Sequence, residues 1–163
     1  MKQHTESELL HLAASYCSVA ERCILDVRQK IVVAGATPEM EEQIISRLLN
    51  EKFIDESRYC LSFVKDKLRF NRWGRIKITY ELRTKNIPAQ MISEAIHQID
   101  DEAYETTLYT LLKDKKRTAK GSNDRDIFNK LYRFAAGRGF ESDLTVQQLK
   151  KLFKKDFDED MDF

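Results

Sequence analysis

The chain has 163 residues, and its 28 Lys and Arg nearly balance its 27 Asp and Glu, which gives a formal net charge of +1. This length suits one domain with a core or a few small stacked units, and the charge argues against a uniformly basic nucleic-acid-binding protein. Because a third of the residues are charged and only five are Gly and two Pro, we expect helices rather than a loop-rich or all-β fold.

The N-terminal segment and the cysteines bear on the compartment. Met1–Glu8 lacks the apolar core of a signal peptide, and no stretch approaches the roughly 18 apolar residues of a membrane span. We therefore expect a cytoplasmic protein without membrane contact. Cys17, Cys23 and Cys60 are odd in number and form no CxxC pair, so they predict reduced thiols, no metal site and no cofactor.

Apolar residues recur at helical spacings of three and four along the whole chain. These stripes span Leu9–Cys17, Ile44–Leu49, Cys60–Leu68, Met91–Ile99 and Tyr104–Leu112. Helix starts are predicted at a capping box, Ser18–Glu21, at Thr37 before Pro38, and at Asp55. Predicted stops are Gly35, Asn86 and the Gly137–Gly139 pair, because these residue types accept a left-handed backbone.

Similar pieces recur about 50 residues apart. Asp26–Lys30 resembles Glu81–Lys85, and Lys85–Ile87 resembles Arg138–Phe140. We therefore predict an all-α protein of three tandem helix-turn-helix-like repeats, each with a long, a second and a short helix, which stack into an elongated, curved molecule. The expected boundaries are 5–53, 55–100 and 101–157, followed by an acidic tail at 158–163.

Two segments need separate treatment. Arg75–Leu82 alternates polar and apolar residues, as strands do, but its counterpart in the first repeat does not alternate, so we predict a helix. On that helix Ile76 and Tyr80 share one side, and Ile78 and Leu82 share a neighbouring side. The acidic run from Asp156 is expected to be frayed or disordered, or else to cover a basic groove.

We find no motif of an enzyme, since the three His are scattered and the paired carboxylates lie at helix starts. The chemistry instead points to a basic block in the middle of the chain, which suits phosphate or carboxylate partners. Its candidate contact residues are Lys65, Lys67, Arg69, Arg72, Trp73, Arg75, Lys77, Arg83 and Lys85. Trp73 could stack on a base, or it could cap the core at a helix corner beside Gly74.

A second basic run, Lys113–Lys120, leads into a predicted loop at Gly121–Asn123, and a loop alone would also explain the polarity of this run. Three-helix units are the size of helix-turn-helix modules, so a sequence-specific DNA-binding regulator is an alternative function. A helical scaffold for some other partner is a third.

Several runs of residues share a pattern with one known family: Phe53–Tyr59, Phe63–Val64, Lys67–Phe70, Trp73–Ile78, Glu81–Ile87, Ile92–Ile96 and, in the third repeat, Phe134–Phe140. Together they resemble the RecX regulatory proteins. The likeness covers nearly the whole chain, and the middle repeat is its specific part. Where that family usually has Gly near the end of the second helix, this chain has Asn86, which tolerates the same turn. The match is looser at Cys23–Asp26 and Ile31–Gly35.

The resemblance implies a non-enzymatic regulator of DNA repair and recombination. Proteins of this family bind the RecA filament on single-stranded DNA and inhibit its ATPase and strand exchange. The expected partners are the RecA nucleoprotein filament and, weakly and without sequence preference, DNA phosphates. No long heptad pattern indicates a coiled coil, so we expect a monomer.

Overall fold

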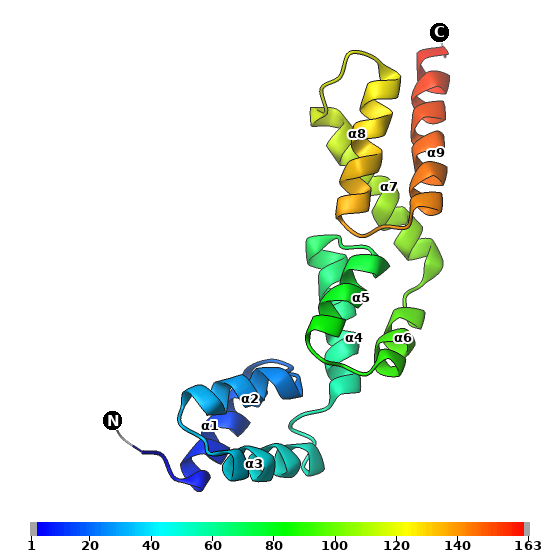
Figure 1. The fold of residues 1–163 in the computed structure, drawn as a ribbon. Coiled ribbons are helices and arrows are strands. Elements are labelled where there is room, and N and C mark those ends of the chain that lie inside the picture. Colours follow the sequence, from blue (N-terminus) through cyan, green and yellow to red (C-terminus); the bar gives the residue numbers. More distant parts are fainter. Residues whose placement is uncertain (1–2, 162–163) are drawn as a thin grey trace. The chain divides into compact units, whose positions relative to one another are not determined.

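The computed structural model describes residues 3–161, with side chains through Lys154. Over that range the chain folds into nine α-helices and one π-helical segment, without a strand (Figure 1), so the predicted all-α class is confirmed. The elements are α1 (Glu6–Val19), α2 (Ile24–Val33), α3 (Pro38–Asn50), α4 (Glu56–Asp66), η1 (Lys67–Asn71), α5 (Arg75–Thr84), α6 (Ala89–His97), α7 (Asp101–Thr118), α8 (Asp124–Gly137) and α9 (Ser142–Met161). In chain order they form three consecutive triplets.

The chain divides into two compact units. Unit 1 comprises the chain up to Phe63 together with Leu82–Ala95, and unit 2 comprises Val64–Glu81 and the chain from Ile96 onward. Each helix of the middle triplet therefore contributes residues to both units. In unit 1, α1, α2 and α3 pack on one another, and in unit 2, α7, α8 and α9 do the same (Figure 1).

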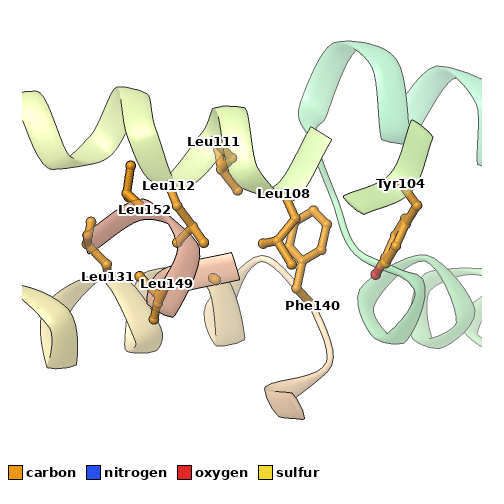
Figure 2. Packing of buried hydrophobic residues seen from close by; sticks show 9 residues of the cluster. Tyr104, Leu108, Leu111, Leu112, Leu131, Phe140, Leu149 and Leu152 are labelled. Atoms are coloured by element: carbon orange, nitrogen blue, oxygen red, sulfur yellow. The ribbon is translucent and has the colours of Figure 1, made fainter. Parts of the chain in front are cut away.

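The predicted apolar stripes form the cores of these units. The core of unit 1 consists of Leu9, Ala13, Val27, Ile31, Ile44, Ile45, Leu48 and Ile54. The core of unit 2 consists of Tyr104, Leu108, Leu111, Leu112, Leu131, Ala135, Phe140, Leu149 and Leu152. Figure 2 shows the labelled leucine side chains of the latter core pointing into the space between α7, α8 and α9. Burying apolar area in this way is the main term that stabilises each helix packing.

The second helix of each triplet ends in a left-handed residue, as predicted. Gly35, Asn86 and Gly139 have φ values of 103°, 60° and 90°. At α8 the Phe140 N–H donates to the Ala135 carbonyl and the Gly139 N–H to the Ala136 carbonyl, the bonds of a Schellman turn. Asn86 thus performs the turn that Gly performs in the other two triplets.

Two predicted helix starts and the helical prediction for α5 are confirmed. Thr37 accepts a hydrogen bond from the Met40 N–H, and Asp55 accepts one from the Arg58 N–H. On α5, Ile78 and Leu82 are fully buried, whereas Ile76 and Tyr80 are 57% and 65% exposed. The alternating pattern of this segment is therefore the pattern of a helix with one buried stripe.

The capping box at Ser18 is wrong. The apolar stripe of α1 carries that helix on through Val19, so the Ser18 hydroxyl donates to the Ser15 carbonyl inside the last turn. The carboxylate of Glu21 pairs instead with Arg58, at 2.5 Å. α2 begins later, at Ile24, after Cys23, which provides no side-chain cap.

Two expectations for the third triplet are also corrected. Its last helix, α9, is not short, since it has 20 residues. α9 runs to Met161, so the acidic segment is helical from Asp156 to Met161. No Gly or Pro interrupts the helix there. Asp162 and Phe163 lie outside the described residues. The basic run at Lys113 is likewise helical, because α7 continues to Thr118.

Candidate partner-binding surface

The strongest part of the predicted basic block lies where α4 runs into η1. Lys65, Arg69 and Arg72 line an open pocket of about 440 Å³, together with Leu68 and three threonines of α7. Lys65 and Arg69 are exposed, and no carboxylate pairs with either of them in the described part of the chain. Two unneutralised cations beside hydroxyl groups form a surface that suits an anionic partner.

The backbone at this pocket is unusual. η1 is a π-helical segment, and it ends at Arg72, whose φ of 52° is left-handed although Arg carries a Cβ. Such backbone conformations are concentrated at functional sites because they cost energy that packing must offset. The Arg72 guanidinium extends to Asp114 of α7, with a distance of 3.0 Å between Nη1 and Oδ2. Arg72 is therefore partly neutralised, unlike Lys65 and Arg69.

Trp73 follows directly and is partly buried. The ammonium groups of Lys67 and Lys77 lie 4.9 Å and 4.6 Å from its ring centroid, which is cation–π geometry. Gly74 is buried, and a Cβ added there would come within 2.3 Å of the Gly139 carbonyl oxygen. The interpretation that Gly74 permits a close backbone approach beside Trp73 therefore agrees with the structure.

Arg75 has partners within the protein. Its guanidinium lies 2.9 Å from Glu141 and 2.6 Å from Asp101, and its carbon atom Cζ lies 3.9 Å from the Tyr104 ring centroid. The Tyr104 hydroxyl accepts from the Arg75 N–H and donates to Glu141. Burial, followed by the hydrogen bond to Glu141, raises the pKa of Tyr104, so the phenol stays protonated. We call Arg75, Tyr104, Glu141 and Asp101 the arginine network.

Arg83 and Lys85 belong to unit 1. Arg83 is exposed, but the Lys85 ammonium lies 2.8 Å from Asp26 of α2. Burial alone would raise the pKa of Asp26, yet the hydrogen bonds from Lys85 and Cys23 hold it below its ordinary value. This pair therefore adds stability above the ordinary Asp pKa and loses it as pH falls through the lowered one. Lys85 stabilises its unit and is less available to a partner than Arg83.

Exposed apolar side chains accompany the free cations in unit 2. Phe70 is 71% exposed, with the Arg69 guanidinium 5.2 Å from its ring centroid. Ile76 and Tyr80 are exposed one turn apart on α5. Large exposed apolar side chains next to cations are typical of binding surfaces.

The sequence interpretation missed the α7 side of this surface. Thr106, Thr107 and Thr110 complete the pocket, and Tyr104 donates a hydrogen bond to Glu141, the carboxylate that pairs with Arg75. The stripe from Tyr104 to Leu112 predicted the buried face of α7, so the opposite, exposed face could have been derived from it. The hydrogen bond between Tyr104 and Glu141 has no signal in the sequence, because these two residues are 37 positions apart.

The thiols and possible metal ligands offer no further chemistry. Cys23 and Cys60 are buried, Cys17 is partly buried, and burial raises the pKa of all three. Among the side chains that the structure describes, which end at Lys154, no group of three or more His, Cys, Asp or Glu is placed to hold a metal ion. No helix within residues 3–161 combines the length and apolarity that crossing a membrane requires.

The fold and this surface define an all-helical protein of consecutive three-helix groups with an exposed cationic surface. A family model described as "RecX, second three-helix domain" matches residues 55–96. The protein is 28% identical over 152 residues to the Regulatory protein RecX of Prosthecochloris aestuarii, covering 93% of this chain and 98% of that one. The Regulatory protein RecX of Lactobacillus gasseri is 23% identical over 99% of this chain, which spans 60% of that relative's length.

A solved structure shares the fold. The crystal structure of RecX from Lactobacillus salivarius superposes with a TM-score of 0.81 at 20% sequence identity, covering 90% of this chain and 96% of that one. The matched domain model and these relatives show that the chain is similar to the RecX regulatory proteins over nearly its whole length.

Proposed function

We propose that this protein binds the RecA filament assembled on single-stranded DNA and inhibits RecA's ATPase and recombinase activities. It would thereby modulate DNA repair and recombination in the cytoplasm, as a monomer without catalysis of its own. The observation that supports the proposal is the similarity to the RecX regulatory proteins, whose second three-helix domain matches residues 55–96.

The contacts would be electrostatic and centred on Lys65 and Arg69. These side chains are exposed and lack a carboxylate partner in the described part of the chain, so they are available to acidic RecA patches or DNA phosphates. Arg72, Lys67 and Lys77 would contribute from the same unit through their positive charge. Trp73 would hold the ammonium groups of Lys67 and Lys77 in place through its ring. Arg83 would add a second contact to the partner, from unit 1. Arg75 and Lys85 would act mainly by holding the fold.

The test is the ATPase rate of the cognate RecA on single-stranded DNA, titrated with this protein. Inhibition well below one-to-one stoichiometry is expected if the protein caps filament ends, and inhibition only near saturation is expected if it coats the groove. An unchanged rate at every ratio would contradict the proposal and favour the helix-turn-helix-like DNA-binding alternative.

Variants locate the contact. Lys65→Gln with Arg69→Gln removes the two free cations and should shift the inhibition curve to higher protein concentration. Arg125→Gln with Arg133→Gln provides a matched control, because both residues are exposed on α8 and neither lines the pocket. Equal inhibition by the two double variants would remove Lys65 and Arg69 from the contact.

A further inference from the structure

α7 presents a single polar face opposite the core. Thr106, Thr110, Lys113 and Arg117 fall within about 60° of one another around the helix axis, at 3.6 residues per turn. The buried leucines of α7, Leu108, Leu111 and Leu112, lie on the other side of the helix and point toward α8 and α9 (Figure 2). The polar face extends about 16 Å from Thr106 to Arg117, at 1.5 Å per residue.

Two open pockets lie along this face, both within unit 2. The first is the pocket of Lys65, Arg69 and the threonines described above. The second has a volume of about 290 Å³ and is lined by Lys113, Lys116, Arg117 and Leu152. The basic residues of the first pocket, Lys65 and Arg69, lie almost 50 positions before Lys113 and Arg117 in the sequence. They share a surface in the fold because both pockets are lined by residues of α7.

Among the side chains that the structure describes, which end at Lys154, positive charge predominates on this surface. Asp114 is the acidic residue of α7 between the two pockets, and Arg72 neutralises it at 3.0 Å. Lys113 and Arg117 are exposed, and no carboxylate among those described side chains pairs with either of them. The threonine hydroxyls between the cations can each donate or accept a hydrogen bond. A row of cations and hydroxyls matches an extended chain of anionic oxygens better than an isolated anion.

The exposed ring of Phe70 favours single-stranded nucleic acid over other polyanions as the ligand of this surface. The Phe70 ring projects into solvent next to Arg69, which itself lines the first pocket. Single-stranded nucleic acid offers unstacked bases as well as phosphates, and base–aromatic stacking requires no particular sequence. An acidic peptide has the charge but no planar groups, and in a duplex the bases are already stacked.

We propose that η1 and the polar face of α7 form a track for the phosphodiester backbone of single-stranded nucleic acid. Phosphates occupy the two pockets, and one base stacks on Phe70. This inference deepens the proposed function and rests on it for the identity of the strand as DNA. It adds Thr106, Thr110, Lys113 and Arg117 to the binding surface.

Fluorescence anisotropy of a labelled oligothymidine, titrated with the full chain in the absence of RecA, tests the track. Lys113→Gln with Arg117→Gln should weaken binding roughly tenfold at low salt and reduce the slope of log K against log salt by about 1.4, which corresponds to two lost phosphate contacts. Phe70→Ala should weaken binding about fivefold or more with little change in that slope. Arg125→Gln with Arg133→Gln should bind like the wild type.

The proposal is overturned if the oligonucleotide does not bind, or if the α7 double variant binds as tightly as the α8 control. It is also overturned if polyglutamate competes as well as oligothymidine and Phe70→Ala has no effect, since the surface then accepts any polyanion. RecA ATPase inhibition is measured on the same variants. If the wild-type protein inhibits RecA but does not bind the oligonucleotide, the track alone is overturned. If the wild-type protein binds the oligonucleotide along the track but does not inhibit RecA, the proposed function alone is overturned.

Discussion

Two groups of cations in unit 2 come from one basic stretch of sequence and have opposite surroundings. Arg75 is only 22% exposed and is paired with Glu141 and Asp101 in the arginine network. Lys65 and Arg69, a few residues earlier, are exposed beside an open pocket, and no carboxylate pairs with them in the described part of the chain. A basic run in a sequence is therefore not one surface, because carboxylates from distant segments determine which of its charges remain free.

The largest loss of stability should come from adding a side chain at Gly74, where the backbone before Arg75 passes close to the turn between α8 and α9. Gly74→Ala places a Cβ about 2.3 Å from the Gly139 carbonyl oxygen, a backbone atom that cannot move aside easily. We expect a loss of about 3 kcal/mol or more in the free energy of unfolding, measured by urea denaturation. Gly121→Ala, whose Cβ meets only side-chain atoms, is the control. A stable Gly74→Ala variant would show that this contact is looser than the structure indicates.

Arg75→Gln should come next. It removes both ion pairs and leaves Glu141 without its cation, in a partly buried site where water screens the charge incompletely. We expect a loss of about 2 kcal/mol in unfolding free energy, smaller than for a fully buried pair. Oligonucleotide binding at a temperature where the variant stays folded should be unchanged. Weaker binding by a folded Arg75→Gln protein would place Arg75 in the contact surface after all.

Tyr104→Phe tests the arginine network by removing a single oxygen atom, the Tyr104 hydroxyl. The hydroxyl accepts from the Arg75 N–H and donates to Glu141, so its removal leaves a backbone donor and a carboxylate each short of one partner. We expect a loss of about 1.5 kcal/mol in unfolding free energy. Tyr109→Phe, on the same helix, controls for the loss of a phenol. Equal stability of the two variants would reduce the network to its ion pairs.

The smallest effect on stability should come from the free cations. Lys65→Gln with Arg69→Gln should change the unfolding free energy by no more than about 0.5 kcal/mol, because both side chains are exposed and neither forms an ion pair among the described residues. The same variant should inhibit RecA only at higher protein concentration and should bind the oligonucleotide more weakly. A strongly destabilised double variant would assign these residues to the fold and erase the contrast with Arg75.

Much of the fold was predictable because local physics decides it. The all-α class follows from periodic apolar residues, and the turns at Gly35, Asn86 and Gly139 follow from residue types that accept a positive φ. The capping box at Ser18 failed because a tertiary ion pair between Glu21 and Arg58 and the continuing stripe of α1 outweighed a local signal. The free and paired classes of cation could not be separated, because their partners lie far away in the chain.

The sequence by itself determined the helices, their buried faces, the basic character of the stretch around η1 and the family resemblance. These properties depend on residues within a few turns of one another. Only the tertiary structure decided that Arg75 pairs with Glu141 and that Lys113 and Arg117 share a helix face with the pocket of Lys65 and Arg69. The physical reason is that a cation is neutralised only when packing brings a carboxylate to within about 4 Å of it. The packing of α7, α8 and α9, which bury their apolar stripes against one another, sets these distances.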